Sequence, residues 1–144
     1  MDKIDEQILE ILEENGREKA SAISQKINLS VSAVIERIRK MTQEGIIEGY
    51  TVRVDRSKMG QDMTALMEVR LEHPKYYEGF SEAVKNIPNI VSCFYTTGDF
   101  DFMLVMYVDN TGHLEEIHRK IKNVEGVGST RTEIVLKKVK DNLV

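Results

Sequence analysis

The sequence predicts an α+β protein in two parts, because the spacing of its apolar residues changes once along the chain. Up to about residue 44, apolar side chains recur every three or four positions, as in amphipathic helices. From residue 63 every second residue is apolar, as in a strand, and helical spacing returns twice between such stretches. We therefore expect a helical domain at 1–54, a linker at 55–61 and a mixed domain at 62–144.

The first domain is expected to contain three helices and a tight turn. Asn28-Leu29-Ser30 separates the second helix from the third, and the Ser30 hydroxyl can cap the third helix. Two helices joined in this way are typical of a helix-turn-helix, whose second helix enters the major groove of DNA. The inward-facing residues are Ile4, Ile8, Ile11 and Leu12 in the first helix, Ala20, Ile23 and Ile27 in the second, and Val34, Ile38 and Met41 in the third.

A wing is expected after the third helix. Gly45 ends that helix, and residues 46–55 have the apolar and β-branched content of a short strand pair. The first domain is therefore predicted to be a winged helix-turn-helix, with Arg53 beside the DNA backbone.

The third helix presents candidate DNA-binding residues on its outer face and flank. Arg37 is suited to a bidentate contact with guanine, Glu36 can accept from a cytosine amine, and Ile35 can touch a thymine methyl. The alternative is that Glu36 and Lys40 form an ordinary surface ion pair. The predicted DNA-binding residues are Ser30, Ser32, Ala33, Glu36, Arg37, Arg39, Lys40 and Arg53.

Charge is distributed unevenly along the chain. With 20 Lys and Arg against 24 Asp and Glu, the net charge is −4, which alone argues against a nucleic-acid partner. However, acidic residues concentrate in the first helix, whereas basic residues concentrate in the third helix and the wing. We expect one basic face on an acidic molecule, which binds double-stranded DNA in a strongly salt-dependent way.

The second domain is predicted to have the order strand, helix, strand, strand, helix, strand, which is the ferredoxin-like βαββαβ arrangement. Strands are expected at 63–71, 90–97, 102–108 and 130–139. The inward residues of the helices are Phe80, Val84 and Ile87, followed by Pro88, in the first, and Leu114, Ile117, Ile121 and Val124 in the second. Both helices cover one sheet face, yet the third strand is apolar on both sides. An uncovered apolar face predicts a homodimer formed through the sheet.

Cys93 and the start of the chain indicate the compartment. As the only cysteine, Cys93 cannot form an intramolecular disulfide or a cysteine-rich zinc site, and its apolar surroundings predict a small core or interface side chain. The start lacks the basic and apolar stretches of a signal peptide, and no segment approaches ~20 uninterrupted apolar residues. We expect a cytoplasmic protein with no membrane partner.

Five segments resemble the Lrp/AsnC family of feast/famine regulators in their order and spacing, over essentially the whole chain. They are Ile4–Leu9, Leu29–Ser32, Glu44–Tyr50, Gly98–Asp101 and Val127–Thr132. The resemblance implies an amino-acid-responsive transcription regulator that dimerises through its second domain and assembles further, commonly to an octamer. It implies no cofactor, but an amino-acid effector that binds between dimers.

The resemblance places the effector at the loop formed by Gly98, Asp99, Phe100 and Asp101, with Thr130 and Thr132 facing it. Glycine lets a ligand approach the backbone, loop amides can hold a carboxylate, and an acidic side chain can hold an α-ammonium group. A plain hairpin is the alternative, because Asp-rich turns with glycine are common. At residue 133 this chain has glutamate where many relatives carry a small or hydroxyl residue, which leaves the identity of the effector open.

The sequence disfavours two other function classes. Siroheme decarboxylases resemble this architecture and use histidine around a porphyrin, but His113 and His118 lie five residues apart on a helix, which does not place two ligands on one face. We expect these and His73 to be surface residues. An architectural DNA-compacting protein is disfavoured by the acidic net charge. We predict a protein that is not an enzyme, with no catalytic residues and no metal site.

Overall fold

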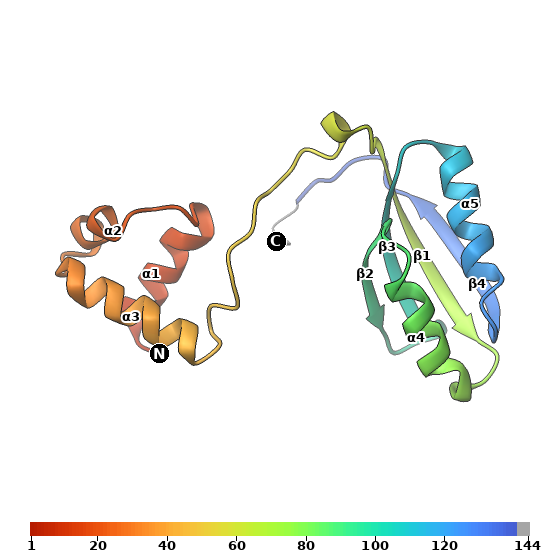
Figure 1. The fold of residues 1–144 in the computed structure, drawn as a ribbon, viewed down its shortest axis with the longest axis horizontal. Helices are drawn as coiled ribbons and strands as arrows, with labels where there is room; N and C mark the ends of the chain where they lie inside the picture. The colour runs from red at the N-terminus through yellow and green to blue at the C-terminus, as the bar shows by residue number, and fades with distance from the viewer. Residues whose placement is uncertain (141–144) are drawn as a thin grey trace. The chain divides into compact units, whose positions relative to one another are not determined.

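The structure, a computed structural model, describes residues 1–140. The chain divides into two compact units, the first formed by residues 1–53 and the second beginning at Val54. The first is helical and the second is built on an antiparallel sheet, so the predicted α+β class is confirmed. Figure 1 shows the helical unit in red to orange and the sheet unit in green to blue.

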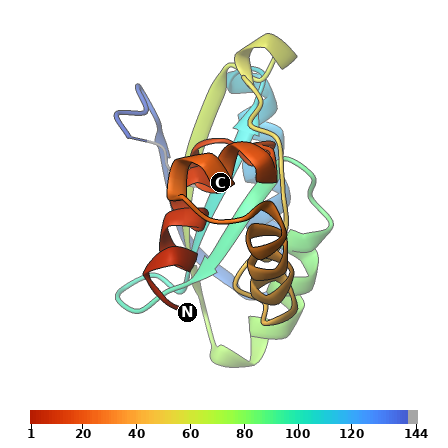
Figure 2. The same ribbon diagram turned by 90° about the vertical axis from the view of Figure 1, so that its left-hand side faces the viewer.

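Three helices form the first unit: α1 (Lys3–Glu14), α2 (Ala20–Ile27) and α3 (Val31–Gln43). Their buried apolar residues are Ile8, Ile23, Val34, Met41 and Ile47, from all three helices and the segment after them. The chain from N-terminus to α3 is red to orange in Figure 2. The predicted inward stripes of the three helices are therefore confirmed.

The turn between α2 and α3 is fixed by local hydrogen bonds. Asn28 adopts a left-handed conformation with φ of 54°, which asparagine tolerates better than most residues. The Leu29 amide then donates to the Ser24 carbonyl at 3.0 Å, which satisfies the C-terminal end of α2. The Ser30 hydroxyl accepts from the Ala33 amide at 3.2 Å and caps α3, as predicted.

The predicted wing does not form strands. Gly45, at φ of 74°, ends the turn after α3, and the Ile46 and Ile47 amides both donate to the Met41 carbonyl. The segment from residue 48 to the sheet unit contains no strand, and it leaves Val52 79% exposed. The strand-pair prediction was wrong because ten residues allow only a very short hairpin, which is marginally stable without a further strand.

Part of the predicted linker is structured against the second unit. Ser57–Met59 form one turn of 3₁₀ helix, η1, which ends at Gly60. The Arg56 guanidinium lies 4.9 Å from the centre of the Tyr107 ring, and the Lys138 ammonium lies 5.0 Å from the same centre. Segments that enter and leave the sheet are thus both held at one aromatic ring.

The second unit has the predicted ferredoxin-like arrangement. Its strands are β1 (Met63–Leu71), β2 (Ile90–Tyr95), β3 (Phe102–Val108) and β4 (Val127–Ile134), and its helices are α4 (Tyr77–Lys85), preceded by the 3₁₀ turn η2 (Pro74–Tyr76), and α5 (Thr111–Lys122). The strands pair antiparallel in the order β2-β3-β1-β4. β1 and β3 are therefore central, and β2 and β4 are edges.

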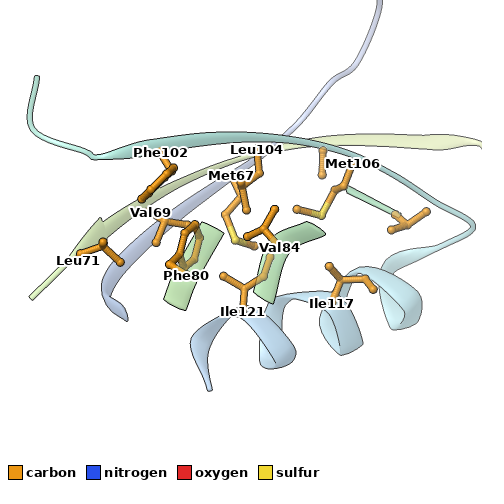
Figure 3. Packing of buried hydrophobic residues seen from close by; sticks show 12 residues of the cluster. Met67, Val69, Leu71, Phe80, Val84, Phe102, Leu104, Met106, Ile117 and Ile121 are labelled. Carbon is orange, nitrogen blue, oxygen red and sulfur yellow. The ribbon is translucent and has the colours of Figure 1, made fainter. Parts of the chain in front are cut away.

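Both helices cover the same face of the sheet, and the core lies between this helical layer and the sheet (Figure 3). Alternate residues of β1 and β3 point into this layer, and Phe80 of α4 packs on Phe102 of β3 with ring centres 4.6 Å apart. Burying each such large apolar side chain stabilises the fold by roughly 1.5–3 kcal/mol. The buried residues are Ala65, Met67, Val69, Leu71, Phe80, Val84, Phe102, Leu104, Met106, Val108, Ile117 and Ile121.

Three boundaries differ from the prediction. β2 ends at Tyr95 instead of at residue 97. α4 ends at Lys85, so Ile87 packs on the core from the following turn. β4 occupies Val127–Ile134 instead of 130–139, because it pairs with β1 and its partner strand begins at Met63, near the level of Ile134. The Val135 amide still donates to the Thr64 carbonyl at 2.9 Å, but β1 begins one residue before Thr64, and Leu136 is almost fully exposed.

The other sheet face is uncovered within the described chain. Its middle is apolar, and its half-buried or exposed apolar and aromatic residues include Leu66, Phe94, Met103, Val105 and Tyr107. Cys93 lies on edge strand β2 and is exposed, so it is not a core residue; an edge strand has a neighbour on one side only. Its place at an interface stays a prediction. Partial burial raises the pKa of its thiol, which keeps it protonated.

Candidate DNA interface and candidate ligand site

The outer face of α3 is exposed along most of its length. Ser32, Ile35, Glu36, Arg39 and Lys40 are exposed, whereas Ala33 is half-buried. The apolar side chain of Ile35 is 54% exposed instead of being buried in the core. The side chain of Ser32 lies 3.3 Å from the Ser30 hydroxyl, so both serines stand at the open end of the helix. Arg53 lies on the exposed segment that ends the first unit.

The charged residues of this face are paired along the helix. Arg39 donates two hydrogen bonds to Glu36, at 3.0 Å and 2.5 Å, and Lys40 lies 3.8 Å from Glu44. The Arg39 guanidinium lowers the pKa of Glu36. The alternative, an ion pair between Glu36 and Lys40, is therefore wrong, because each of these residues pairs with a different partner. Exposed pairs of this kind contribute little stability, so a phosphate can take the place of the carboxylate at small cost.

Arg37 points away from the outer face, contrary to the predicted guanine contact. Its Nη1 atom donates to Asp2 at 2.9 Å and 3.0 Å and to Asp5 at 2.8 Å. Asp2 caps α1 and forms a reciprocal capping box with Asp5, so Arg37 fastens α3 to the N-terminus of α1. Helical spacing placed Arg37 on the flank of α3, but it could not reveal that two carboxylates lie beside it.

The loop between β2 and β3, residues Thr96 to Asp101, is held to the end of β1. Gly98 takes a φ of 107°, a conformation that favours glycine. The Asp101 amide donates to the Val69 carbonyl at 2.9 Å, and the Leu71 amide donates to the Asp101 carboxylate at 2.7 Å. Arg70 adds a bond from Nε to the Asp99 carbonyl at 2.6 Å. The Asp101 side chain is therefore an anchor of the loop.

A hollow of about 260 Å³ lies between this loop and the uncovered sheet face. The Phe100 ring is flanked by two guanidinium groups, those of Arg70 at 5.2 Å and Arg131 at 5.4 Å from its centre. Arg131 also forms an ion pair with Glu68 of β1. The hollow is lined by Glu68, Thr96, Thr97, Gly98, Asp99, Phe100 and Arg131.

Thr130 and Thr132 do not face this hollow. They pair with Val69 and Met67, whose side chains are in the core, so both threonines point to the helix-covered face. Thr130 lies 3.4 Å from His118 of α5, and the Thr132 hydroxyl is buried without a hydrogen-bond partner in residues 1–140. The predicted arrangement was wrong by one strand position, since Arg131 between them faces the loop.

Sequence reasoning missed four residues of this hollow: Thr96 and Thr97 of the loop, and the charged pair Glu68 and Arg131. Glu68 and Arg131 occupy directly opposed positions on β1 and β4, and opposite charges at such positions attract each other across a strand pair. A glutamate in one strand and an arginine in another are a sequence signal, but this signal becomes useful only when the register of the two strands is known.

The histidines serve local hydrogen bonding. His73 accepts from the Lys75 amide at 3.0 Å and caps η2, His113 lies 3.7 Å from Asp109, and His118 lies beside Thr130. Within residues 1–140, no three His, Cys, Asp or Glu side chains are grouped closely enough to hold a metal ion. No helix in that range is long and apolar enough to cross a membrane.

Comparison with known families covers both units. Residues 1–48 match the family model for a winged helix-turn-helix DNA-binding domain, and residues 64–144 match that for the Lrp/AsnC ligand binding domain. The chain belongs to the Lrp/AsnC family. The similarity extends over almost the full length of its relatives.

Two relatives illustrate the range of sequence identity. HTH-type transcriptional regulator FL11 of Pyrococcus horikoshii is 35% identical, across 98% of this chain and 93% of that protein. The leucine-responsive regulatory protein of Escherichia coli K12 is 30% identical, across 99% and 88%. These relatives are transcriptional regulators, which confirms that the chain is not an enzyme.

Solved structures of the same fold agree closely. Transcriptional regulator NMB0573 of Neisseria meningitidis, in complex with L-Met, has a TM-score of 0.93 at 26% identity, with 98% of this chain and 93% of that one covered. AsnC of E. coli has a TM-score of 0.92 at 25% identity, with 100% and 97% covered. The chain is thus a DNA-binding transcriptional regulator of this family, with a ligand-binding domain.

The Arg37 contact generates a pH-dependent prediction. Backbone hydrogen bonds, and then hydrogen bonds from Arg37, lower the pKa of Asp2 and Asp5 in the folded state. Groups with lowered folded pKa values stabilise the fold above their unfolded pKa of about 3.9, and this contribution is lost as the pH falls through the folded values. We expect Arg37→Met to lower the melting temperature at pH 7 and to lower it much less at pH 2, as measured by circular dichroism.

Arg39→Met is the matched control, because its partner Glu36 lies on the same helix and joins no second helix to it. It should change the melting temperature less at pH 7. An Arg37→Met protein with the same melting temperature as the parent at pH 7 would contradict the proposed fastening of α3 to α1.

Proposed function

We propose that the chain binds specific DNA sites as a homo-oligomer through the outer face of α3, and that an amino acid bound at the β2–β3 loop regulates this binding. The observation that carries the DNA part is the face itself. α3 follows a well-formed turn, is capped by Ser30 and exposes Ser32, Ile35 and Glu36 on one side. A hydroxyl, a methyl group and a carboxylate are the groups that read base edges in a major groove.

Arg39 and Lys40 are assigned to phosphates. Both are exposed and paired to carboxylates on their own helix, so DNA needs only to displace Glu36 and Glu44. Displacement of Glu36 from Arg39 also releases its carboxylate toward a cytosine amine. Arg37 has a supporting role, because its ion pairs join α3 to the N-terminus of α1. Arg53 remains a candidate for the backbone beside the site.

The DNA prediction concerns the double variant Arg39→Ala, Lys40→Ala. On a site selected from a random DNA library, we expect weaker binding and a shallower dependence of log K on log salt, by about 0.9 for each phosphate that the variant no longer neutralises. Glu36→Ala should instead cost about 1–3 kcal/mol and relax preference at one base pair. Fluorescence anisotropy at several salt concentrations, on selected and scrambled DNA, measures both.

Lys120→Ala, Lys122→Ala provides the control, since these lysines lie at the exposed end of α5 in the sheet unit. This variant should keep the salt dependence of the parent. Identical salt slopes for the parent and the α3 variant would refute the phosphate assignment.

The hollow at the β2–β3 loop has the chemistry of an amino-acid backbone. Arg131 supplies a guanidinium for an α-carboxylate, and Glu68 and Asp99 supply acceptors for an α-ammonium group. Gly98 leaves the loop backbone open to a ligand. The NMB0573 protein was solved with L-Met, which supports an amino acid as the class of ligand. The hollow is smaller than most ligand pockets, as expected if a second subunit completes it.

A thermal-shift screen of the twenty amino acids tests this assignment. A ligand at a hundredfold excess over its Kd stabilises the folded state by about 2.7 kcal/mol. We expect at least one amino acid to raise the melting temperature of the parent, and Arg131→Gln to abolish that shift. Lys122→Gln, which removes an exposed charge at the end of α5, outside the lining of the hollow, should retain it. A shift of equal size in Arg131→Gln would exclude the hollow as the effector site.

The uncovered sheet face is the proposed dimer interface. Its centre consists of Leu66, Met103 and Val105, flanked by the exposed ring of Phe94, so it offers apolar area that water solvates poorly. Further assembly of dimers, to an octamer as the family resemblance implies, would bring β2–β3 loops of neighbouring dimers together. In that case the effector and the assembly state are coupled, because a ligand that binds one assembly more tightly favours it.

Val105→Asp tests the interface. A carboxylate at the centre of the uncovered face should disfavour its burial and reduce the mass seen by light scattering to that of one 16.5 kDa chain. Asn86→Asp adds the same charge after α4, on the helix-covered side, and should leave the mass at that of the parent oligomer. An unchanged mass for Val105→Asp, with a native circular dichroism spectrum, would rule out dimerisation through this face.

A further inference from the structure

A second hollow lies on the helix-covered side of the loop that carries the proposed effector site. Its volume is about 390 Å³, within the range of small-molecule pockets. The end of β1 and the segment that leads into α4 form one side, and Tyr95 of β2 and Asp101 form the other. Asp101 belongs to the anchored loop, so the two hollows lie on either side of one short segment.

One wall of this hollow is aromatic and firmly held. The rings of Tyr77 and Tyr95 are 5.0 Å apart and nearly perpendicular, at 78°. Both pack against the buried ring of Phe102, with centres 5.5 Å and 5.4 Å away. Tyr77 and Tyr95 themselves stay exposed, with 37% and 66% of their surface accessible. A buried residue thus supports two rings whose outer surfaces remain available to a ligand.

The charged side chains of the lining are both acidic. Glu72 and Asp101 contribute carboxylates, and within residues 1–140 neither forms an ion pair. One Asp101 oxygen accepts from the Leu71 amide at 2.7 Å, which leaves the other oxygen for a ligand. His73 accepts from the Lys75 amide through Nδ1. Among the residues that the structure describes, no lysine or arginine lines the hollow.

We propose that this hollow binds a small organic ammonium ion, an aliphatic amine that lacks a carboxylate. Carboxylates form strong charge-assisted hydrogen bonds with ammonium groups, and aromatic rings attract cations over their faces. The hollow lined by Arg131 offers a cation for a ligand carboxylate, whereas the described lining of this hollow is acidic and aromatic. The two hollows therefore select different ligands, and the amine site stands independently of the proposed effector and DNA contacts.

Isothermal titration of the full chain with cadaverine tests the proposal, with pentanediol as the neutral analogue of the same length. We expect cadaverine to bind and pentanediol to release no heat. Glu72→Gln should weaken cadaverine binding about tenfold, because one charge-assisted bond is removed. Tyr95→Leu should weaken it as well, since the apolar replacement has no ring to attract the cation.

Glu78→Gln is the matched control, an exposed glutamate on α4 outside the lining, and it should bind cadaverine as the parent does. Arg131→Gln should also leave cadaverine binding intact, which separates this site from the effector hollow. Equal heats for cadaverine and pentanediol, no cadaverine binding by the parent, or unchanged binding in folded Glu72→Gln and Tyr95→Leu would each overturn the proposal.

Discussion

The main chain of β1 is the element on which the second unit depends. It pairs with β3 on one side and β4 on the other, so it fixes the register of both. At its end, the carbonyl of Val69 and the amide of Leu71 no longer serve only the sheet, because they bind the backbone and side chain of Asp101. The position of the β2–β3 loop is therefore set by the same strand that organises the core. Both hollows are lined by residues that these hydrogen bonds hold in place.

The first unit depends on an ion-pair contact between two of its helices. Three short helices bury only a small core, and a unit of this size has little stability to spare. Arg37 donates to two carboxylates that already cap α1, so a single guanidinium joins the first and third helices and complements the helix terminus. A residue that a helical wheel assigns to the DNA surface thus acts in the framework that presents that surface.

Much of the fold could be predicted from the sequence, and the particular failures share a cause. The turn at Asn28 and the cap at Ser30 depend on residues next to each other in the chain, so local pattern was sufficient. The facing of Thr130 and Arg131 depends on pairing between strands more than fifty residues apart, and a shift of one position exchanges the two faces. The Arg37 contact and the unpaired wing likewise depend on which distant segments lie nearby, which periodicity does not encode.

The contact of Arg56 with the Tyr107 ring limits the length of the connection between the two units. The Arg56 guanidinium lies over that ring, and Ile47 is buried in the helical unit, so residues 48–55 connect these two points. Such a segment can span at most roughly 30 Å. In the proposed dimer, this short connection limits how far the two helix-turn-helix units can separate, and we expect the protein to tolerate only a narrow range of half-site spacings in its operators.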